Sequence, residues 1–314
     1  MSKKSLKILY VGNFQPNSVG EPEIAYALEQ LGHAVIKLEE SETNLQKIRE
    51  TIGREKPDLL FFAKFRVGEK AEVREFLLKE LKIPSVCWLF DLYWGYRREI
   101  EIRIDMIPCF YANIVFTSDG GHDEMWKKYR INHFTLRQGI DERVKIGKPI
   151  YDTKADIGFI GSRLTWAGWP YRGQLLDFLK ETYGNRFEHF GGDGNVRHEE
   201  LNNLLATLKI TVCDSVESPK YWSNRIYETI GRGGFAIHPR LEGLNEEFEE
   251  YKHFIPYRYG DFKGLKEKLD YFLENEDERE KIRRAGYAYC HKKHTYRHRV
   301  KEFLKILEEQ KIII

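Results

Sequence analysis

Short apolar runs, each followed by a stretch with the period of an α-helix, recur along this chain in two successive sets. Alternation of this kind is the sequence form of repeated βαβ units. The runs are apolar at nearly every position, which is typical of strands that helices cover on both faces of a parallel sheet. We therefore expect an α/β protein with two doubly wound parallel sheets.

The first set contains six expected strands and four expected helices. The strands are Ile8–Val11, Ala34–Leu38, Leu59–Ala63, Ser85–Phe90, Ile114–Thr117 and His133–Leu136. The helices are Glu21–Leu31, Asn44–Gly53, Glu69–Leu81 and Gly121–Tyr129.

The second set begins after Asp141–Lys154, whose Gly, Pro and charged residues indicate an interdomain linker. Its expected strands are Ile157–Ile160, Phe187–Phe190, Ile210–Cys213, Phe235–His238 and Phe254–Pro256. Its expected helices are Gly173–Thr182, Glu199–Leu205 and Asn224–Ile230, before a nearly continuous helical region from Phe262 to about Glu309. We set the domain limits at 1–147, 148–292 and 293–314.

Composition narrows the possible classes of protein. The 314 residues suffice for two domains, and a net charge of +2 provides no basic arm for nucleic acid. The four cysteines show no metal or redox spacing, and no apolar stretch reaches the length of a membrane span. We expect a cytoplasmic protein with no nucleic-acid partner and no integral membrane segment.

Open α/β sheets bind ligands beyond the carboxyl ends of their strands, so the loops after the strands are the candidate sites. Aromatic residues make up 14% of the chain. Five tryptophans fall within or beside these loops: Trp88, Trp94, Trp166, Trp169 and Trp222. We expect part of the aromatic excess to line a cleft shared by the two sheets.

In the first half, Asn13 and Phe14 lie in a loop that would let a ligand approach the backbone. The alternative is an ordinary turn in which Ser18 caps the helix. Asp91, with Tyr93 and Trp94 beside it, could orient a hydroxyl nucleophile between rings that pack against sugar. The alternative is that Asp91 caps a helix and the rings belong to the core.

Asp119 and His122 follow the next strand and could also serve the cleft, although helix capping explains them as well. In the second half, Gly161, Ser162 and Arg163 form a turn whose backbone N–H groups and guanidinium could hold a diphosphate. Gly191 and Gly192 imply close backbone approach, and the alternative is a flexible turn.

The segment from Asp214 to Gly234 is the most informative. Ser223 is the expected N-cap of a helix with Asn224 and Arg225 at its start, and Lys220 precedes it. Lys220 and Arg225 near a helix N-terminus would make a phosphate site. The structural alternative is a buried pair between Arg225 and Glu228, which share a helix face.

Three motifs together resemble the GT-B glycosyltransferases, and within them the CgeB-like (spore maturation type) family. They are Ile114-Val115-Phe116-Thr117-Ser118-Asp119, Ser223-Asn224-Arg225-Ile226-Tyr227-Glu228 with Gly231 and Gly234, and His294-Thr295-Tyr296-Arg297-His298-Arg299. The resemblance implies two Rossmann-like domains facing a cleft, with a helical C-terminal tail that packs back on the first domain. It further implies that residues 1–147 hold the acceptor and residues 148–292 the nucleotide sugar.

The resemblance also implies roles for single residues. Glu228 corresponds to the acid that binds the donor ribose, and the diphosphate contacts correspond to Gly161, Ser162, Arg163, Lys220 and Arg225. Asp91 lies where relatives often place a catalytic His, and Arg225 would stabilise the leaving diphosphate. Asp91 and Arg225 are therefore the catalytic candidates. Many retaining relatives carry a second Glu where this chain has Lys220, so the stereochemical outcome stays open.

The predicted activity is hexosyl transfer from a nucleotide sugar to a glycan, small-molecule or protein acceptor, without a cofactor. The chain contains no Asp-x-Asp, and lysine and arginine could neutralise the leaving diphosphate without a metal. Two alternatives remain: a nucleotide-sugar isomerase or hydrolase, and a non-catalytic module that binds glycan or nucleotide.

Overall fold

The computed structural model describes residues 5–63, 68–94, 107–163, 170–191 and 196–313. The chain divides into two units. Unit 1 comprises residues 1–141 and 296–314, and unit 2 comprises residues 142–295. The domain limits predicted from the sequence were residues 147 and 292.

Unit 1 contains a six-stranded sheet in the order β2-β1-β3-β4-β5-β6, and every strand pair is parallel. Its strands are β1 (Lys7–Gly12), β2 (Ala34–Glu39), β3 (Leu59–Phe62), β4 (Ser85–Leu89), β5 (Ile114–Thr117) and β6 (His133–Thr135). Its helices are α1 (Glu21–Gln30), α2 (Leu45–Glu55), α3 (Lys70–Glu75) with a π-helical turn at Phe76–Glu80, α4 (Asp123–Lys128) and α11 (Tyr296–Glu309). All expected strands and helices of this half are present.

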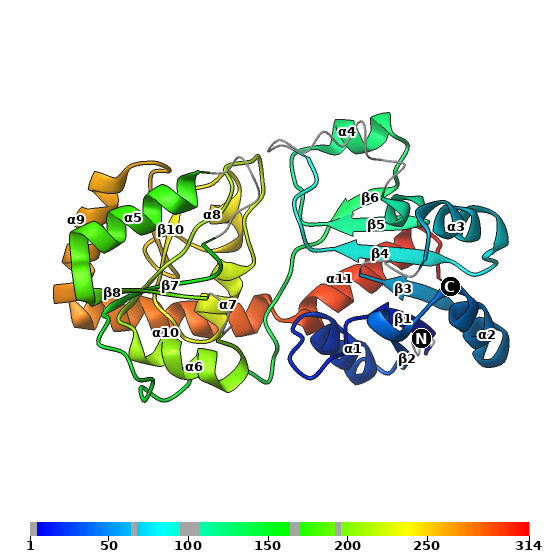
Figure 1. Cartoon of the computed structure of the whole chain (residues 1–314), viewed down its shortest axis with the longest axis horizontal. Helices are drawn as coiled ribbons and strands as arrows, with labels where there is room; N and C mark the ends of the chain where they lie inside the picture. Colours follow the sequence, from blue (N-terminus) through cyan, green and yellow to red (C-terminus); the bar gives the residue numbers. More distant parts are fainter. Residues whose placement is uncertain (1–4, 64–67, 95–106, 164–169, 192–195, 314) are drawn as a thin grey trace. The chain divides into compact units, whose positions relative to one another are not determined.

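Helices cover both faces of the unit 1 sheet (Figure 1). Because side chains alternate along a strand, Leu9 and Val11 of β1 face one core while Ile8 and Tyr10 face the other. The first core also contains residues of α2, α3 and α4. The second contains α1 and α11, so the last helix of the chain completes the core of the first unit.

Unit 2 contains a five-stranded parallel sheet in the order β11-β10-β9-β7-β8. Its strands are β7 (Ile157–Ile160), β8 (Phe187–Phe190), β9 (Ile210–Val212), β10 (Ala236–Pro239) and β11 (Ile255–Tyr257). Its helices are α5 (Tyr171–Tyr183), α6 (His198–Thr207), α7 (Arg225–Gly231), α8 (Leu244–Glu247), α9 (Phe262–Glu274) and α10 (Glu276–Lys293). The single turn α8 was not expected, because one turn is too short to show a helical period.

In unit 2, α5 packs against α9, and α7 packs against α10. The Phe178 and Phe262 rings stack at 5.0 Å, and a Cβ on Gly286 of α10 would touch Ile230 of α7. Figure 1 shows α5 on one side of the sheet and α6, α7 and α10 on the other. The expected fold, two doubly wound parallel sheets with a helical C-terminal region, is confirmed.

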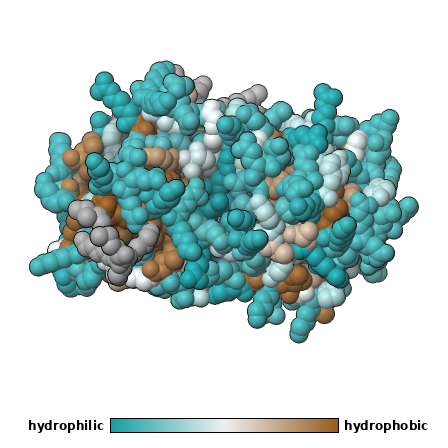
Figure 2. Space-filling view, turned by 180° about the vertical axis from the view of Figure 1, so that it is seen from behind, coloured by the Kyte–Doolittle hydropathy of each residue, from teal (hydrophilic) through white to brown (hydrophobic). Residues whose placement is uncertain are grey.

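Most of the described aromatic side chains are buried, which corrects the expectation that Trp88, Trp94 and Trp222 line a cleft. Trp88 and Trp126 are 0% and 1% exposed, and Trp94 and Trp222 are 4% and 3% exposed. Trp166 and Trp169 lie outside the described residues. On the face shown in Figure 2, hydrophobic side chains form only small separate patches. No described helix is long and apolar enough to cross a membrane.

Candidate functional site

The loops after β7, β8 and β9 lie at one edge of the unit 2 sheet. These three strands are neighbours in the order β9-β7-β8 and run parallel, so their carboxyl ends meet there. Gly161 follows β7, Gly191 follows β8, and Asp214 lies just beyond β9. The Gly161 N–H donates to the Phe190 carbonyl over 2.8 Å, which ties two of the loops together.

Two arginines meet at one buried carboxylate at this edge. Asp214 is 0% exposed and accepts from Arg172 Nε at 2.7 Å and from Arg172 Nη2 at 3.3 Å. Its other partner is Arg225, whose Nη1 bonds to the Asp214 carboxylate and, at 3.1 Å, to the Asp214 carbonyl. We call Asp214, Arg172 and Arg225 the arginine cluster.

Further bonds fix each guanidinium. Arg172 Nη1 donates to the Ser162 carbonyl at 2.9 Å, and Arg225 Nε donates to the Ile160 carbonyl at 2.8 Å. Both guanidiniums lie over the Phe159 ring, at 5.6 Å for Arg172 and 5.0 Å for Arg225. Each donor therefore points in a direction set by strand and loop backbone.

The arginine cluster carries one net positive charge, from two guanidiniums and one carboxylate. The side chains of Arg172 and Arg225 are 12% and 16% exposed. Burial lowers the pKa of Arg172, and the Asp214 charge opposes this shift. A partly desolvated guanidinium pair with an excess charge is suited to binding an anion such as a diphosphate.

Glycine is required at two points of this edge. Gly161 has φ 142°, and a Cβ there would lie 2.6 Å from Arg225 Nη2. Gly191 has φ 117°, and a Cβ there would lie 2.9 Å from the Gly161 backbone. Both positions combine positive φ with close contact, which only glycine tolerates. The neighbouring Gly192 lies outside the described residues.

Ser223 does not cap α7. The helix begins at Arg225 with Asn224 as its N-cap residue, and the cap makes no side-chain hydrogen bond. The Ser223 hydroxyl instead donates to the Asp214 carbonyl at 2.9 Å, and the Ser223 N–H donates to the Ser215 hydroxyl at 3.0 Å. Ser223 thus connects the segment before α7 to the loop that carries Asp214.

The buried pair between Arg225 and Glu228, the structural alternative to a phosphate site, does not form, and each residue has another partner. Arg225 bonds to Asp214, and Glu228 accepts from Arg232 Nε at 2.6 Å. Arg232 also donates to Asn202 at 2.7 Å. The side chain of Glu228 remains 22% exposed, so it has access to solvent for a further partner.

Three other predicted donor-site residues are exposed: Arg163, Lys220 and Asn224. Arg163 pairs with Asp177 of α5 at 2.7 Å, and both side chains are more than half exposed. Lys220 and Asn224 are exposed, and Lys220 has φ 46°. The described contacts therefore join Gly161, Ser162, Ser223 and Arg225, and they leave Arg163, Lys220 and Asn224 at the surface.

In unit 1, Asp119 organises the loop after β4. It is 0% exposed, and its Oδ2 accepts from the backbone N–H groups of Tyr93 and Trp94, each at 2.7 Å. The Trp94 ring stacks on Tyr129 at 5.5 Å, and both Tyr93 and Trp94 belong to the first core. The rings of Tyr93 and Trp94 therefore pack inward, because Asp119 holds their backbone against the sheet.

Asp91 stands exposed at the start of this loop, where it can reach solvent. His122 is half-buried at the N-cap position of α4, and burial lowers its pKa. After β1, Asn13 accepts from the Ser18 hydroxyl, and the Phe14 ring meets Tyr10 edge-on at 5.1 Å. The loop of Asn13 and Phe14 is thus closed on itself and on the core.

Ser18 is not the cap of α1, which corrects the expected turn. The N-cap is Gly20 with φ 97°, and its N–H donates to the Glu23 carboxylate. A glycine at this position accommodates a positive φ that serine would not adopt at low cost.

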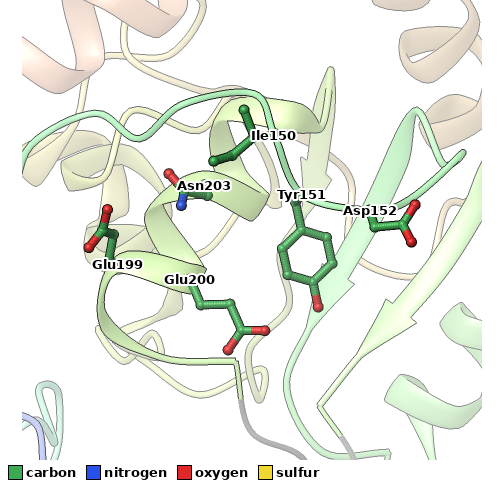
Figure 3. A pocket seen from close by; sticks show the side chains of 6 residues that line it. All are labelled: Ile150, Tyr151, Asp152, Glu199, Glu200 and Asn203. Carbon is green, nitrogen blue, oxygen red and sulfur yellow. The ribbon is translucent and has the colours of Figure 1, made fainter.

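A hollow of about 560 Å³ lies elsewhere in unit 2, between α6 and the segment before β7. Ile150, Tyr151, Asp152, Glu199, Glu200 and Asn203 line it. Figure 3 shows the Tyr151 ring between the side chains of Glu200 and Asp152. Three carboxylates repel a diphosphate, so we place the candidate anion site at the arginine cluster and not in this hollow.

Sequence reasoning assigned no role to Arg172 or Asp214. Asp214 directly follows an expected strand, as Asp91 does, so the strand-end rule would have selected it. Arg172 gave no such signal, because it lies 42 residues from Asp214 in the sequence. Only the packing of α5 beside the end of β9 brings the two together.

Comparison with known proteins gives one family match, over residues 172–305, to the family described as "Glycosyl transferase-like". No curated protein sequence matches the chain.

Three solved structures share the fold over nearly their whole length. HepE from Anabaena, in complex with UDP-glucose, has 13% identity and a TM-score of 0.65, with 97% of this chain and 100% of that chain covered. Sucrose-phosphate synthase from Thermosynechococcus elongatus has 10% identity and a TM-score of 0.66, with 97% of this chain and 99% of that chain covered. A structure assigned to a UDP-N-acetylglucosamine 2-epimerase from Listeria monocytogenes has 12% identity and a TM-score of 0.53, covering 99% and 98%.

Proposed function

We propose that this chain, which has the GT-B fold and a glycosyl transferase-like second unit, moves a hexosyl group from a nucleoside diphosphate sugar to an acceptor hydroxyl. The observation that carries the proposal is the arginine cluster at the carboxyl ends of β7 and β9. Guanidiniums placed there would face the charge that develops on a leaving diphosphate. We keep the CgeB-like subfamily and a cytoplasmic location as predictions.

In the proposed reaction, the bond between the sugar C1 and the diphosphate oxygen breaks and the acceptor oxygen bonds to C1. The acceptor proton passes to a base, for which the exposed Asp91 is our candidate. The electron pair of the broken bond goes to the diphosphate, and Arg172 and Arg225 stabilise it there. No metal is needed for this step in our proposal, because the guanidiniums provide the positive charge.

Within the donor, we propose that Glu228 accepts hydrogen bonds from the ribose hydroxyls. Its partner Arg232 orients the carboxylate at 2.6 Å, and the carboxylate keeps part of its surface in solvent. UDP is the first nucleotide to test, because HepE was solved with UDP and with UDP-glucose.

The test is nucleotide binding by Arg225→Ala and Glu228→Ala, measured by calorimetry with UDP, GDP and ADP. We expect each variant to bind the preferred nucleotide at least about tenfold more weakly, because each loses a charge-assisted hydrogen bond. Arg186→Ala is the matched control, since Arg186 pairs with Asp156 before β7, at the amino ends of the same strands. Wild-type affinity in both site variants would refute this donor site.

Incubation with nucleotide sugars separates the proposed transferase from its two alternatives. Release of the nucleoside diphosphate that depends on an added acceptor supports transfer. An epimerised donor would indicate an isomerase, and hydrolysis without an acceptor would indicate a hydrolase. Epimerisation must be tested because the chain shares its fold with the Listeria structure. Binding without turnover would indicate a non-catalytic module.

A further inference from the structure

The Asp214 carboxylate bonds to the same two guanidiniums that the proposed function assigns to the donor diphosphate. Both of its oxygens already accept from arginine, from Arg172 on one side and Arg225 on the other. Its backbone carbonyl is also engaged, by Ser223 and by Arg225. The residue thus links the end of β9 to the first turns of α5 and α7.

Two guanidiniums over one ring repel each other unless an anion stands between them. Burial lowers the pKa of Arg172, the Asp214 charge raises it, and the nearby Arg225 charge lowers it further. Removal of one partner from a buried charge network leaves the other charge uncompensated. Asp214 therefore makes the side-by-side arrangement of Arg172 and Arg225 possible.

The arrangement leaves one nitrogen directed at the glycine turn. Arg225 uses Nε and Nη1 for its bonds to Ile160, Asp214 and Ser223, and its Nη2 bonds to no residue that the structure describes. This Nη2 lies against Gly161, where an added Cβ would approach within 2.6 Å. A guanidinium that is held on two of its nitrogens loses little further freedom when the third binds an anion.

We infer that Asp214 is a positioning residue for the donor diphosphate: it holds Arg172 and Arg225 in the orientation that binds the anion, and it reduces their combined charge to a single positive one. This inference rests on the proposed function. Asp214 acts through the arginines and does not itself contact the diphosphate.

Asp156 provides the matched comparison inside the same unit. It lies before β7, at the opposite ends of the same strands, and it also stands between two cations, Arg186 and Lys209, each at 2.8 Å. A purely structural role for such a carboxylate would be shared by both residues. A positioning role in diphosphate binding belongs to Asp214 alone.

The experiment compares the affinities of UDP and uridine for the wild type, Asp214→Asn and Asp156→Asn by calorimetry. The dissociation constant of uridine divided by that of UDP measures how much the diphosphate contributes to affinity. We expect Asp214→Asn to reduce this ratio at least about tenfold while uridine affinity stays within about twofold of the wild type. Asp156→Asn should keep the wild-type ratio, even where it lowers the thermal stability.

Asp214→Glu keeps the charge and covers the case in which Asp214→Asn does not fold. The extra methylene moves the carboxylate relative to both guanidiniums, so we expect this variant also to lose most of the diphosphate contribution. A wild-type ratio in the folded variants, or a larger one in Asp214→Asn, would overturn the inference, since a larger ratio means that Asp214 only opposes the diphosphate. If the wild type binds none of UDP, GDP and ADP, the proposed function itself fails.

Discussion

At the residue scale, Gly161 combines a positive φ with a position directly beside the Arg225 guanidinium. Its φ is 142°, and a Cβ added there would lie 2.6 Å from Arg225 Nη2, so both its backbone conformation and its surroundings exclude a side chain. We predict that Gly161→Ala weakens UDP binding at least about tenfold and lowers the melting temperature, because the turn is strained and Arg225 must move. Calorimetry with UDP and thermal unfolding measure the two effects.

Gly173→Ala is the control for this glycine. Gly173 lies inside α5, and a Cβ there would meet no atom within 4 Å. Alanine is the better helix former by about 1 kcal/mol, so this variant should be as stable as the wild type or more stable, with unchanged UDP affinity. Equal losses in the two variants would contradict the assigned role of Gly161.

The partly buried His133 should make unit 1 less stable at acid pH. Burial lowers its pKa to about 3, while its ordinary value is 6.5. The unfolded chain therefore binds more protons between these values, and the stability of unit 1 falls as the pH drops from about 6.5 toward 3. Each unit of pKa difference corresponds to about 1.4 kcal/mol when fully expressed.

The measurement is the free energy of unfolding of the wild type and His133→Gln at pH 7.5 and at steps down to pH 4. Glutamine can still bond to Thr117, whose hydroxyl lies 2.7 Å from His133 Nε2. The variant should lose less stability on acidification than the wild type does, whatever the difference at pH 7.5. An identical acid dependence would show that His133 is not the group responsible.

At the element scale, α11 belongs to unit 1 although the rest of that unit ends at residue 141. Phe303 is 1% exposed and meets the rings of Phe61, Phe116 and Trp88 at 5.2, 5.3 and 6.4 Å. We predict that Phe303→Ala costs about 3–5 kcal/mol, as large-to-small changes in a core do. Urea unfolding, followed by circular dichroism, measures the loss.

Lys305 on the same helix provides the comparison. Its side chain is 72% exposed and forms an i,i+4 pair with Glu309. Lys305→Ala should change the free energy of unfolding by less than about 0.5 kcal/mol. A similar effect of both substitutions would mean that α11 does not stabilise unit 1 through its buried face.

At the scale of the whole molecule, the two units should respond differently to nucleotide. We predict that UDP slows amide hydrogen exchange in unit 2, in the loops that contain Gly161, Gly191 and Asp214, because a ligand stabilises the state that binds it. The amino-edge segment around Asp156 serves as the internal reference. Protection confined to unit 1 would contradict the proposed nucleotide site in unit 2.

Much of this architecture could be predicted from the sequence. Apolar runs identified all the strands, and their lack of polar alternation identified the sheets as parallel, because strands buried on both faces cannot alternate. The strand ends then located Gly161, Gly191 and the Arg225 segment. The helix caps were predicted less well, since the Ser18 and Ser223 hydroxyls donate to acceptors in their own loops and Gly20 and Asn224 occupy the N-cap positions.

Side-chain partners were decided by the tertiary structure. Local periodicity describes one element at a time, so it cannot tell that Arg172 and Arg225 share Asp214 across 42 and 11 residues. Nor could it tell a tryptophan beside a ligand from one turned into the core, because both stand next to a strand end. The sequence alone determined two parallel α/β sheets and the strand ends at which the candidate site lies; the packing of α5, α7 and β9 decided which charges meet there.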